Sequence, residues 1–449
     1  TEELYLKYWL PMESGYAEEY GILFNRFVRD YLTVKTQSIP KIDRVYEEFK
    51  NYAKDLNNDE KILALVKDIA KFNDYYCKMV VGGEEENRLA TIFTRLSTLK
   101  ADVIYPFLLP IYEDYKNKNI SLTEFEEILL LVESYVFRRS VCGIPTNSMN
   151  KTFANLYKNI DKQKYFESIK VLFILLRSYQ RFPTDSEFQT MLIDKQDFYK
   201  FNRNNYFFDR IENYGKREYI STKNYTIEHV LPQNKNLSNN WKQMLGENWS
   251  EIQDNYIHKL GNLTLTGYNS KLSDKDFIDK KTIEGGFDKS PLMLNEYFKN
   301  IKEWNKDHIE KRATLLAEKA IKIWSYPEVS NAIIEFYNKK SAKTLEYGLD
   351  DYGFLVGTIR NLYDELKNRI LELDNLIQIE YTKLYIAYKL EENIVDVIPQ
   401  RNALKLSIKG NYKDINDPEQ KCRDVKGIGR WGNGDIQLII SNYDDIEYA

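Results

Sequence analysis

The residues best suited to chemistry in this chain are an adjacent acid and histidine, Glu228 and His229. They end a β-rich run that begins at Tyr225, and Pro232 is compatible with the strand ending there. A histidine can deprotonate water near neutral pH, because its unperturbed pKa is about 6.5. A carboxylate beside it can hold a hard cation such as Mg²⁺, which prefers oxygen ligands and often takes only one or two protein groups. The pair therefore predicts phosphodiester hydrolysis, in which the cation neutralises charge that develops on the phosphate.

The elements that must position this pair are short. A Gly261-Asn262 turn opens a second β-rich run, Leu263 to Thr266, and Asn269 follows. A helix is then expected with Ser273 as its N-cap. Adjacent side chains point to opposite faces of a strand, so we expect a bend or bulge after Ile227 that brings the acid and the histidine to one site. Strand, turn, strand and helix in this order is the layout of a ββα-metal (HNH-type) nuclease.

The segment from about Phe182 to Trp324 resembles the HNH-like family called domain of unknown function 1524. The residues that match are Y-T-I-E-H-V-L-P-Q (225–233), L-G-N-L-T-L (260–265), Asn269 with Leu272-Ser273, Phe277 with Lys280, and Arg312 in I-E-K-R-A-T-L-L. Upstream, R-R-S-V-C-G-I-P-T-N-S-M-N (138–150) resembles the helical region that precedes this nuclease in GmrSD-type, modification-dependent (type IV) restriction proteins.

The resemblance implies a role for each matching residue. His229 would be the general base, and Asn262 would orient the loop that carries it by hydrogen bonding. Glu228 and Asn269 would hold Mg²⁺ or Mn²⁺. The interval from Asn262 to Asn269 is shorter than in many HNH sites, so Asp274 stays open as the alternative second ligand.

Phosphate binding depends on local lysine and arginine rather than on the net charge of the chain, which is −4. Basic residues interleaved with aromatic ones lie close in sequence to the proposed site. A solvated helix face with core aromatics would explain each of them equally well. The candidates for nucleic-acid binding are Arg203, Arg210, Lys271 and Arg312. Lys280 is a candidate catalytic residue. Both Lys280 and Arg312 could either contact a phosphate or anchor a loop.

The predicted fold is mainly α, with a ββα-metal (HNH-like) nuclease core and a small C-terminal α+β domain. Apolar spacings of three and four residues predict helices over most of the first part of the chain. The predicted organisation is a helical scaffold region at 1–205, the nuclease domain at 206–325, a linker at 326–343 and the α+β domain at 344–449.

The C-terminal domain resembles domain of unknown function 5655, for which a substrate-recognition or partner-docking role is expected. A helix near Thr358 to Leu373 should precede strands around Ile377 to Ala387, Ile394 to Pro399, Ala403 to Lys409 and Ile436 to Ser441. The glycine-rich run from Gly427 to Asp435 does not open a helix after a strand, so it is expected to be a loop rather than a dinucleotide site.

The remaining features of the sequence limit the classes of protein to which the chain can belong. No apolar run reaches the ~18 residues that a membrane-spanning helix needs. The three cysteines form neither a disulfide framework nor a zinc pattern, and a cytoplasmic location is expected. The chain opens without Met and ends at Tyr448-Ala449, so it is expected to be the C-terminal part of a longer protein that begins with a ParB-like nucleotide-hydrolysing domain.

The expected function is that of a metal-dependent endonuclease of a bacterial anti-phage restriction system, acting on foreign, modified double-stranded DNA. Two alternatives remain open at this point. One is an RNA-directed nuclease, because the site reads phosphate rather than sugar. The other is a non-catalytic nucleic-acid-binding or scaffold protein with a degenerate HNH site.

Overall fold

The computed structural model of the chain describes residues 2–16, 20–341, 347–374, 376–390, 392–427 and 433–448. Most of these residues are helical, and the chain divides into two compact units. The first unit contains Thr1–Pro145, Asn150–Ile174 and Phe182–Glu328. The second contains Thr146–Met149, Leu175–Arg181 and Val329–Ala449. Each unit is described by itself.

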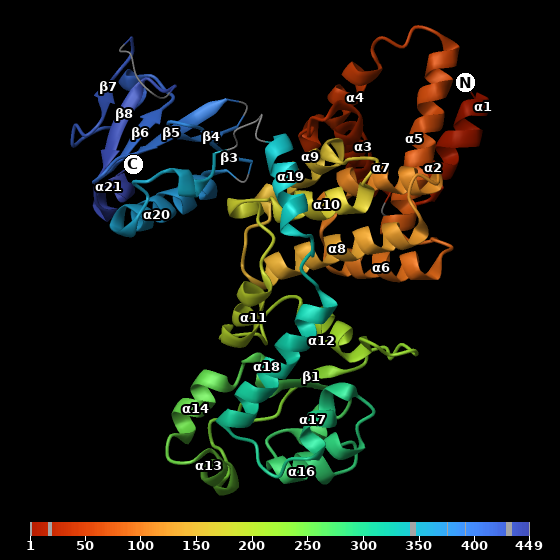
Figure 1. Cartoon of the computed structure of the whole chain (residues 1–449), viewed down its shortest axis with the longest axis vertical. Helices are drawn as coiled ribbons and strands as arrows, with labels where there is room; N and C mark the ends of the chain where they lie inside the picture. The colour runs from red at the N-terminus through yellow and green to blue at the C-terminus, as the bar shows by residue number, and fades with distance from the viewer. Residues whose placement is uncertain are drawn as a thin grey trace. The chain divides into compact units, whose positions relative to one another are not determined.

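The first unit begins with a group of helices, as the apolar spacing predicts (Figure 1). Local signals fix where they start: Asn58 accepts a hydrogen bond from the Lys61 amide at the start of α5, and Ser121 with Glu124 forms a capping box at the start of α8. The helices are α1 (Glu2–Leu4), α2 (Leu10–Ser14), α3 (Tyr20–Thr36), α4 (Val45–Ala53), α5 (Asp59–Val80), α6 (Asn87–Thr98), α7 (Tyr105–Lys116), α8 (Leu122–Val141), α9 (Asn147–Leu156) and α10 (Tyr165–Ile174).

A second set of elements in the same unit carries the candidate site. Two strands, β1 (Thr226–His229) and β2 (Leu263–Thr266), pair antiparallel in a regular register from Thr226↔Thr266 to His229↔Leu263. The helices of this set are α11 (Asp185–Asp194), α12 (Asn204–Asn213), α13 (Asn239–Leu245), α14 (Trp249–Tyr256), α15 (Asn269–Leu272), α16 (Phe277–Thr282), α17 (Glu296–Lys299) and α18 (Lys306–Ile323).

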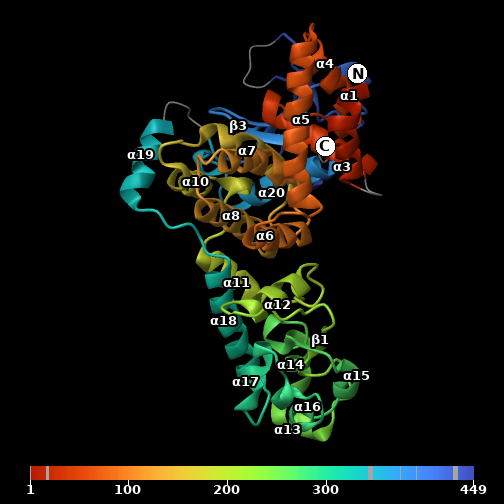
Figure 2. The same cartoon turned by 90° about the vertical axis from the view of Figure 1, so that its right-hand side faces the viewer.

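Helix α18 is the main support of this region, and it runs beside α11 and α12 (Figure 2). Gly261 packs directly against it: a Cβ at this position would lie 2.0 Å from the Ile309 carbonyl oxygen. The end of α18 also joins the earlier helices. The Phe137 and Trp324 rings stack with centroids 4.1 Å apart, and Arg138 Nε donates to the Trp324 carbonyl at 2.6 Å.

The expected helix start at Ser273 is wrong. Ser273 is the C-cap of α15 and has φ +41°, whereas α16 begins after Asp276. The Asp276 carboxylate accepts hydrogen bonds from Ser238 and Asn240 instead of capping the helix. The local spacing predicts that Asp276 belongs to a capping box, but its carboxylate bonds to residues distant in the sequence instead.

The second unit is an α+β domain, as predicted. Its six strands are all antiparallel in the order β3-β4-β5-β6-β8-β7, and buried side chains of α20 pack against the sheet (Figure 1). The elements are α19 (Asn331–Ser341), α20 (Gly357–Leu373), β3 (Gln378–Tyr381), β4 (Ile386–Lys389), β5 (Asn393–Pro399), β6 (Leu404–Ile408), β7 (Arg423–Asp424), β8 (Ile436–Ile440) and α21 (Tyr443–Tyr448).

The single strand expected from Ile377 to Ala387 is instead a hairpin, β3 and β4. Thr382 turns the chain, because its hydroxyl donates to the Tyr385 carbonyl at 2.7 Å. The glycine-rich run expected to be a loop lies partly outside the described residues, at 428–432.

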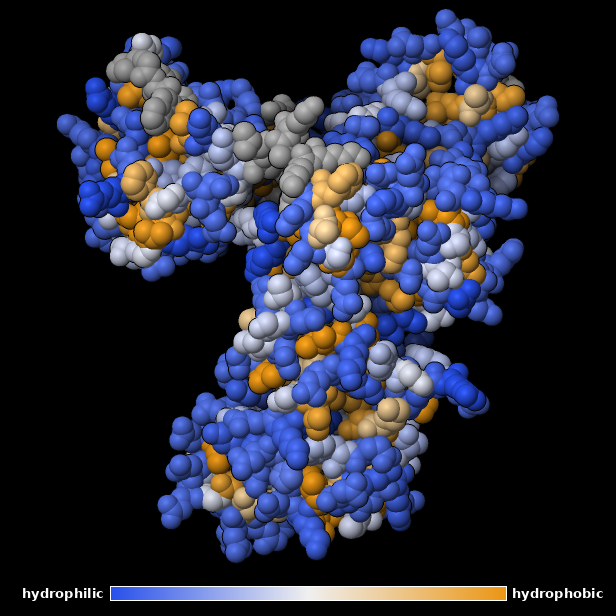
Figure 3. All heavy atoms as spheres, in the orientation of Figure 1, coloured by the Kyte–Doolittle hydropathy of each residue, from blue (hydrophilic) through white to orange (hydrophobic). Residues whose placement is uncertain are grey.

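No helix in the described ranges is both long and apolar enough to cross a membrane. On the face drawn in Figure 3, hydrophilic side chains predominate and hydrophobic ones form separate patches.

Candidate active site

His229, the last residue of β1, is enclosed by polar and aromatic side chains. His229 is only 5% exposed, and its Nε2 lies 3.1 Å from His258 Nδ1. Gln233 Nε2 lies 2.9 Å from the other ring nitrogen, Nδ1. Tyr199 packs its ring against both imidazoles. Burial lowers the pKa of His229 to about 3, with the charges of His258 and Lys280 acting in the same direction. His229 is therefore neutral near pH 7, as a general base must be.

Glu228 and Lys280 form a buried ion pair beside it. Glu228 is 3% exposed and Lys280 is 0% exposed, and Lys280 Nζ lies 2.5 Å from Glu228 Oε1. The same ammonium donates to the His229 carbonyl at 2.8 Å. Burial raises the pKa of Glu228 and lowers that of Lys280, and the attraction between the two groups opposes both shifts. Lys280 thus ties α16 to the end of β1.

Asn262 joins the segments on either side of the site. Its Oδ1 accepts from the Leu231 amide at 2.8 Å and from Trp304 Nε1 at 2.9 Å. Its Nδ2 donates to the carbonyls of Leu231 and Ile257 at 3.1 and 3.0 Å. These bonds hold the loop after His229 and the residue before His258. Orienting the histidine loop stays the predicted role of Asn262.

Asn269 lies against the start of β1. Its Nδ2 donates to Thr226 Oγ1 at 3.1 Å and to the Ile227 carbonyl at 2.9 Å, next to Glu228. Asp274 is exposed, and its Oδ2 accepts from Asn234 at 2.8 Å. That hydrogen bond lowers the pKa of Asp274. Asn269 is therefore fixed directly at the strand that carries Glu228, whereas Asp274 is fixed to the Asn234 loop.

The bend expected after Ile227 is absent, because the register of β1 with β2 is regular through His229. Consequently, Glu228 and His229 leave β1 on opposite faces. Glu228 contacts Lys280 of α16, and His229 contacts His258 and Tyr199. The two side chains are linked through Lys280, which bonds the carboxylate of one and the carbonyl of the other.

The candidate ligands Glu228 and Asn269 offer oxygens of the kind that a hard cation prefers. Among the described residues, no three His, Cys, Asp or Glu side chains form a metal cluster. Mg²⁺ needs only one or two protein groups, because it keeps several of its waters. Within the described part of the chain, Glu228 Oε2 and Asn269 Oδ1 have no hydrogen-bond partner, while Glu228 Oε1 and Asn269 Nδ2 are anchored. One carboxylate oxygen and one amide oxygen are thus left for a cation.

Three of the four arginine and lysine residues expected to contact nucleic acid point into the protein. Arg203 donates to Ser140 and to the Leu99 carbonyl, and Arg210 lies 3.0 Å from Glu133. Arg312 donates to the carbonyls of Gly261, Leu263 and Leu294, and burial lowers its pKa to about 9. These guanidinium groups are not positioned to contact a phosphate on the surface. Arg312 anchors the Gly261-Asn262 turn, and Lys271 remains exposed.

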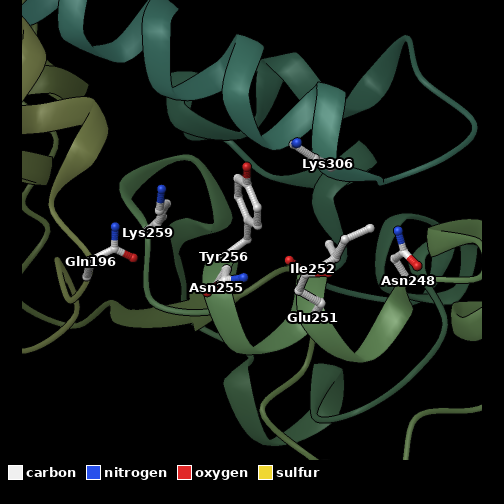
Figure 4. Close-up of a pocket in the computed structure, with 8 residues that line it drawn as sticks. All are labelled: Gln196, Asn248, Glu251, Ile252, Asn255, Tyr256, Lys259 and Lys306. Atoms are coloured by element: carbon white, nitrogen blue, oxygen red, sulfur yellow. The ribbon is translucent and has the colours of Figure 1, made fainter.

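A polar pocket of about 330 Å³ lies in the same domain, between α14 and the start of α18 (Figure 4). The Tyr256 ring lies within 4.8 Å of Lys259 Nζ and 5.8 Å of Lys306 Nζ, and Lys259 follows His258 in the chain. The pocket therefore carries two cationic side chains, one of them adjacent in the chain to His258. It is lined by Gln196, Asn248, Glu251, Ile252, Asn255, Tyr256, Lys259 and Lys306.

Residues 182–319, which include every element around this site, match the family model of the C-terminal domain of GmrSD restriction endonucleases. This segment is a GmrSD restriction endonuclease C-terminal domain. Residues 356–445, in the α+β unit, match domain of unknown function 5655. The resemblance predicted for both segments is therefore confirmed, and the family matched by the first is described as restriction endonucleases.

A shorter similarity extends to a curated relative. An uncharacterized protein of Haemophilus influenzae is 40% identical over 90 residues, which is 20% of this chain and 30% of that protein. The matched segment is thus less than a third of the relative's length.

Several contacts in the GmrSD domain are not evident from local sequence. Trp304 donates to Asn262 from far along the chain, and buried Gln253 donates to the carbonyls of Pro232 and Asn234. Tyr199 and His258 meet His229 although neither belongs to the Glu228-His229 motif. The signal available for His258 is its place just before the L-G-N-L-T-L motif.

The buried His229 gives the domain a testable pH dependence. A histidine whose folded pKa is depressed contributes stability above its unfolded pKa of about 6.5, and that contribution is lost as the pH falls toward about 3. Between these values the unfolded state binds the extra proton, so the free energy of unfolding should fall by up to ~1.4 kcal/mol per pH unit. His229→Asn should lack this slope. Urea unfolding of both proteins between about pH 7 and about pH 4 measures it, and equal slopes would contradict the buried neutral state.

Proposed function

We propose that this chain is a metal-dependent, HNH-type endonuclease that hydrolyses phosphodiester bonds of double-stranded DNA in a restriction system. The observation that carries the proposal is the Glu228-His229 pair at the end of β1, with Asn262 holding the loop that follows. The order β1, β2, α16 around this pair supports a ββα-metal core. The match to GmrSD restriction endonucleases supports nuclease chemistry.

In this proposal His229 accepts a proton from water, whose oxygen then attacks the phosphorus while the bond to the leaving oxygen breaks. Glu228 and Asn269 would hold a Mg²⁺ or Mn²⁺ ion, with Asp274 as the alternative to Asn269, and the cation would supply positive charge to the phosphate. Because Glu228 and His229 leave β1 on opposite faces, this scheme requires the end of β1 to bend when substrate and cation bind. Asn262 fixes the His229 loop, and Lys280 keeps Glu228 ionised and in place because its ammonium is the carboxylate's partner.

The substrate and the partner domain belong to the same proposal. Foreign, modified DNA is the expected substrate, and a ParB-like nucleotide-hydrolysing domain on the N-terminal side is the expected control element. Helices of residues 1–205 would couple that domain to the nuclease at 206–325, with 326–343 as a linker to the α+β domain. Such coupling requires a two-state element that both sites bias.

The proposal is tested with purified protein, Mg²⁺, and four substrates: plain duplex DNA, phage DNA with modified bases, single-stranded DNA and RNA. Metal-dependent cutting of duplex DNA that is abolished by EDTA and by Glu228→Gln is the expected result. Cutting of RNA alone would favour the RNA-directed alternative. Binding without cutting under every metal condition would favour a degenerate site.

Lys271 should contribute to DNA binding through phosphate contact, because its side chain is 53% exposed and it lies in α15 with Asn269, a proposed metal ligand. Lys271→Ala should weaken binding to any duplex sequence and reduce the slope of log affinity against log salt by ~0.9. Lys61→Ala on α5, which removes an exposed lysine bonded to Asn57, is the matched control. Fluorescence anisotropy across a salt series gives both slopes. Identical slopes in the two variants would remove Lys271 from the interface.

A further inference from the structure

The contact between His229 and His258 assigns protons to both rings. A neutral imidazole has one nitrogen that donates and one that accepts. The Gln233 side-chain amide nitrogen lies 2.9 Å from His229 Nδ1, and an amide nitrogen can only donate. In this orientation of the Gln233 amide, His229 Nδ1 is the accepting nitrogen and its Nε2 carries the hydrogen. That hydrogen faces His258 Nδ1 at 3.1 Å, so His258 Nδ1 accepts.

His258 itself is held by the backbone of the loop before α12. The Phe198 and Tyr199 amides donate to the His258 carbonyl at 2.9 and 3.3 Å. The Tyr199 ring stacks on the His258 ring with 14° between the planes and 5.6 Å between centroids. Asn262 adds a bond to the carbonyl of Ile257, the preceding residue. The acceptor at His258 Nδ1 is thus fixed from both sides.

We propose that His258 is a positioning residue of the nuclease site: its Nδ1 accepts the Nε2 hydrogen of His229 and thereby presents His229 Nδ1 as the basic nitrogen. This inference rests on the proposed function for its catalytic meaning, although the proton assignment can be measured without any cleavage. His258 does not touch the substrate in this scheme. It acts through His229, as the partner of a ring nitrogen that selects one tautomer.

Gln233 marks the place of the attacking water. Its amide occupies the hydrogen-bonding position at His229 Nδ1, and the residue is exposed. A water molecule that replaced this amide would donate its hydrogen to Nδ1 along the same direction. When Nδ1 takes the proton, the hydrogen on Nε2 stays bonded to His258, so the imidazolium that forms keeps its partner.

The first test reads the tautomer directly by nitrogen NMR of protein labelled with ¹⁵N-histidine. The chain has three histidines, so three imidazoles give signals, and single substitutions assign them. In the wild type the proton of neutral His229 should be on Nε2. Gln233→Ala should keep the proton of His229 on Nε2, because His258 still accepts it. In Gln233→Ala/His258→Ala the two tautomers should mix, because neither partner remains. A proton on Nδ1 in the wild type, or an unchanged single tautomer in the double variant, overturns the proposal.

The second test uses two amide variants of equal polarity. The Asn side chain places its amide near the position of ring Nδ1, whereas the longer Gln reaches the position of ring Nε2. His258→Asn should therefore keep kcat within a few-fold of the wild type. His258→Gln and His258→Ala should lower kcat by ~10-fold or more, within the ~10²–10⁴-fold that a general base supplies, with little change in KM. Equal kcat in the Asn and Gln variants would contradict positioning through Nδ1.

The two tests separate this inference from the proposed function. If the wild type cuts no nucleic acid, the proposed function fails while the NMR result still decides the tautomer. If cleavage is lost in His229→Ala but the His258 variants retain kcat and Gln233→Ala/His258→Ala retains the wild-type tautomer, the nuclease stands and the role of His258 falls. Thermal melting of each variant shows that the rate changes come from folded protein.

Discussion

Replacing His229 by alanine is expected to reduce DNA cleavage by ~10²–10⁴-fold while the protein stays folded, because the attacking water loses its proton acceptor. The site supports this expectation, since burial keeps His229 neutral and Gln233 and His258 occupy its two ring nitrogens. Cleavage should be measured as an initial rate on plasmid DNA at saturating Mg²⁺. The effect should appear in kcat rather than KM, because the base acts only in the chemical step.

His308→Ala is the matched control, since it removes the same side chain elsewhere in the GmrSD domain. His308 bonds to Tyr297 and stacks on Trp304, and it makes no contact with His229 among the described residues. Its loss should leave the cleavage rate close to that of the wild type. Full activity in a folded His229→Ala protein would remove His229 as the base and make His258 the next candidate.

The secondary structure around the candidate site could be predicted where neighbouring residues determine it. Helix spacing predicted the helical first part, and two β-rich runs with a Gly-Asn turn before the second predicted β1 and β2. Glu228, His229 and Asn262 could be selected because their types fit the chemistry and their spacing fits the strand ends. The α+β character of the last unit was predicted for the same reason, from strand-forming runs after one amphipathic helix.

The contacts that could not be predicted join side chains to groups that are far away in the sequence. Three arginines were expected to bind phosphate because of their charge, but each contacts another part of the protein. Arg203 bonds to Ser140, Arg210 pairs with Glu133, and Arg312 bonds to backbone carbonyls. Charge alone does not tell a buried anchor from a surface contact. The helix start at Ser273 failed similarly, because Ser238 and Asn240 engage Asp276.

The Glu228–Lys280 pair was the least accessible from sequence, since the two residues are 52 positions apart and both are buried. The sequence left Lys280 as a candidate either for phosphate contact or for anchoring a loop. In the structure its ammonium has two partners, Glu228 Oε1 and the His229 carbonyl. A lysine in this position sets the charge balance around a carboxylate that is also the proposed cation ligand.

Lys280→Met should therefore destabilise the metal-free protein by ~3–5 kcal/mol, because it leaves the Glu228 carboxylate buried without its partner. The methionine keeps a similar length of side chain, so the loss is mainly electrostatic. Burial raises the pKa of Glu228, so the deficit should be small below the carboxyl's unfolded pKa of about 4.3 and grow as the pH rises through the folded pKa. Glu228→Gln/Lys280→Met should recover most of the stability, since no buried charge remains.

Mg²⁺ distinguishes a purely structural pair from a metal site. A cation bound to Glu228 Oε2 would replace part of the charge that Lys280→Met removes, so Mg²⁺ should raise the unfolding free energy of this variant more than that of the wild type. Ligand at 100 times its Kd stabilises the folded state by ~2.7 kcal/mol. Urea unfolding with and without Mg²⁺ measures the difference, and the double variant should show almost no response because it lacks the carboxylate. An equal Mg²⁺ response in all three proteins would place the cation away from Glu228, and the metal ligands of the nuclease would then have to be sought elsewhere, beginning with Asp274.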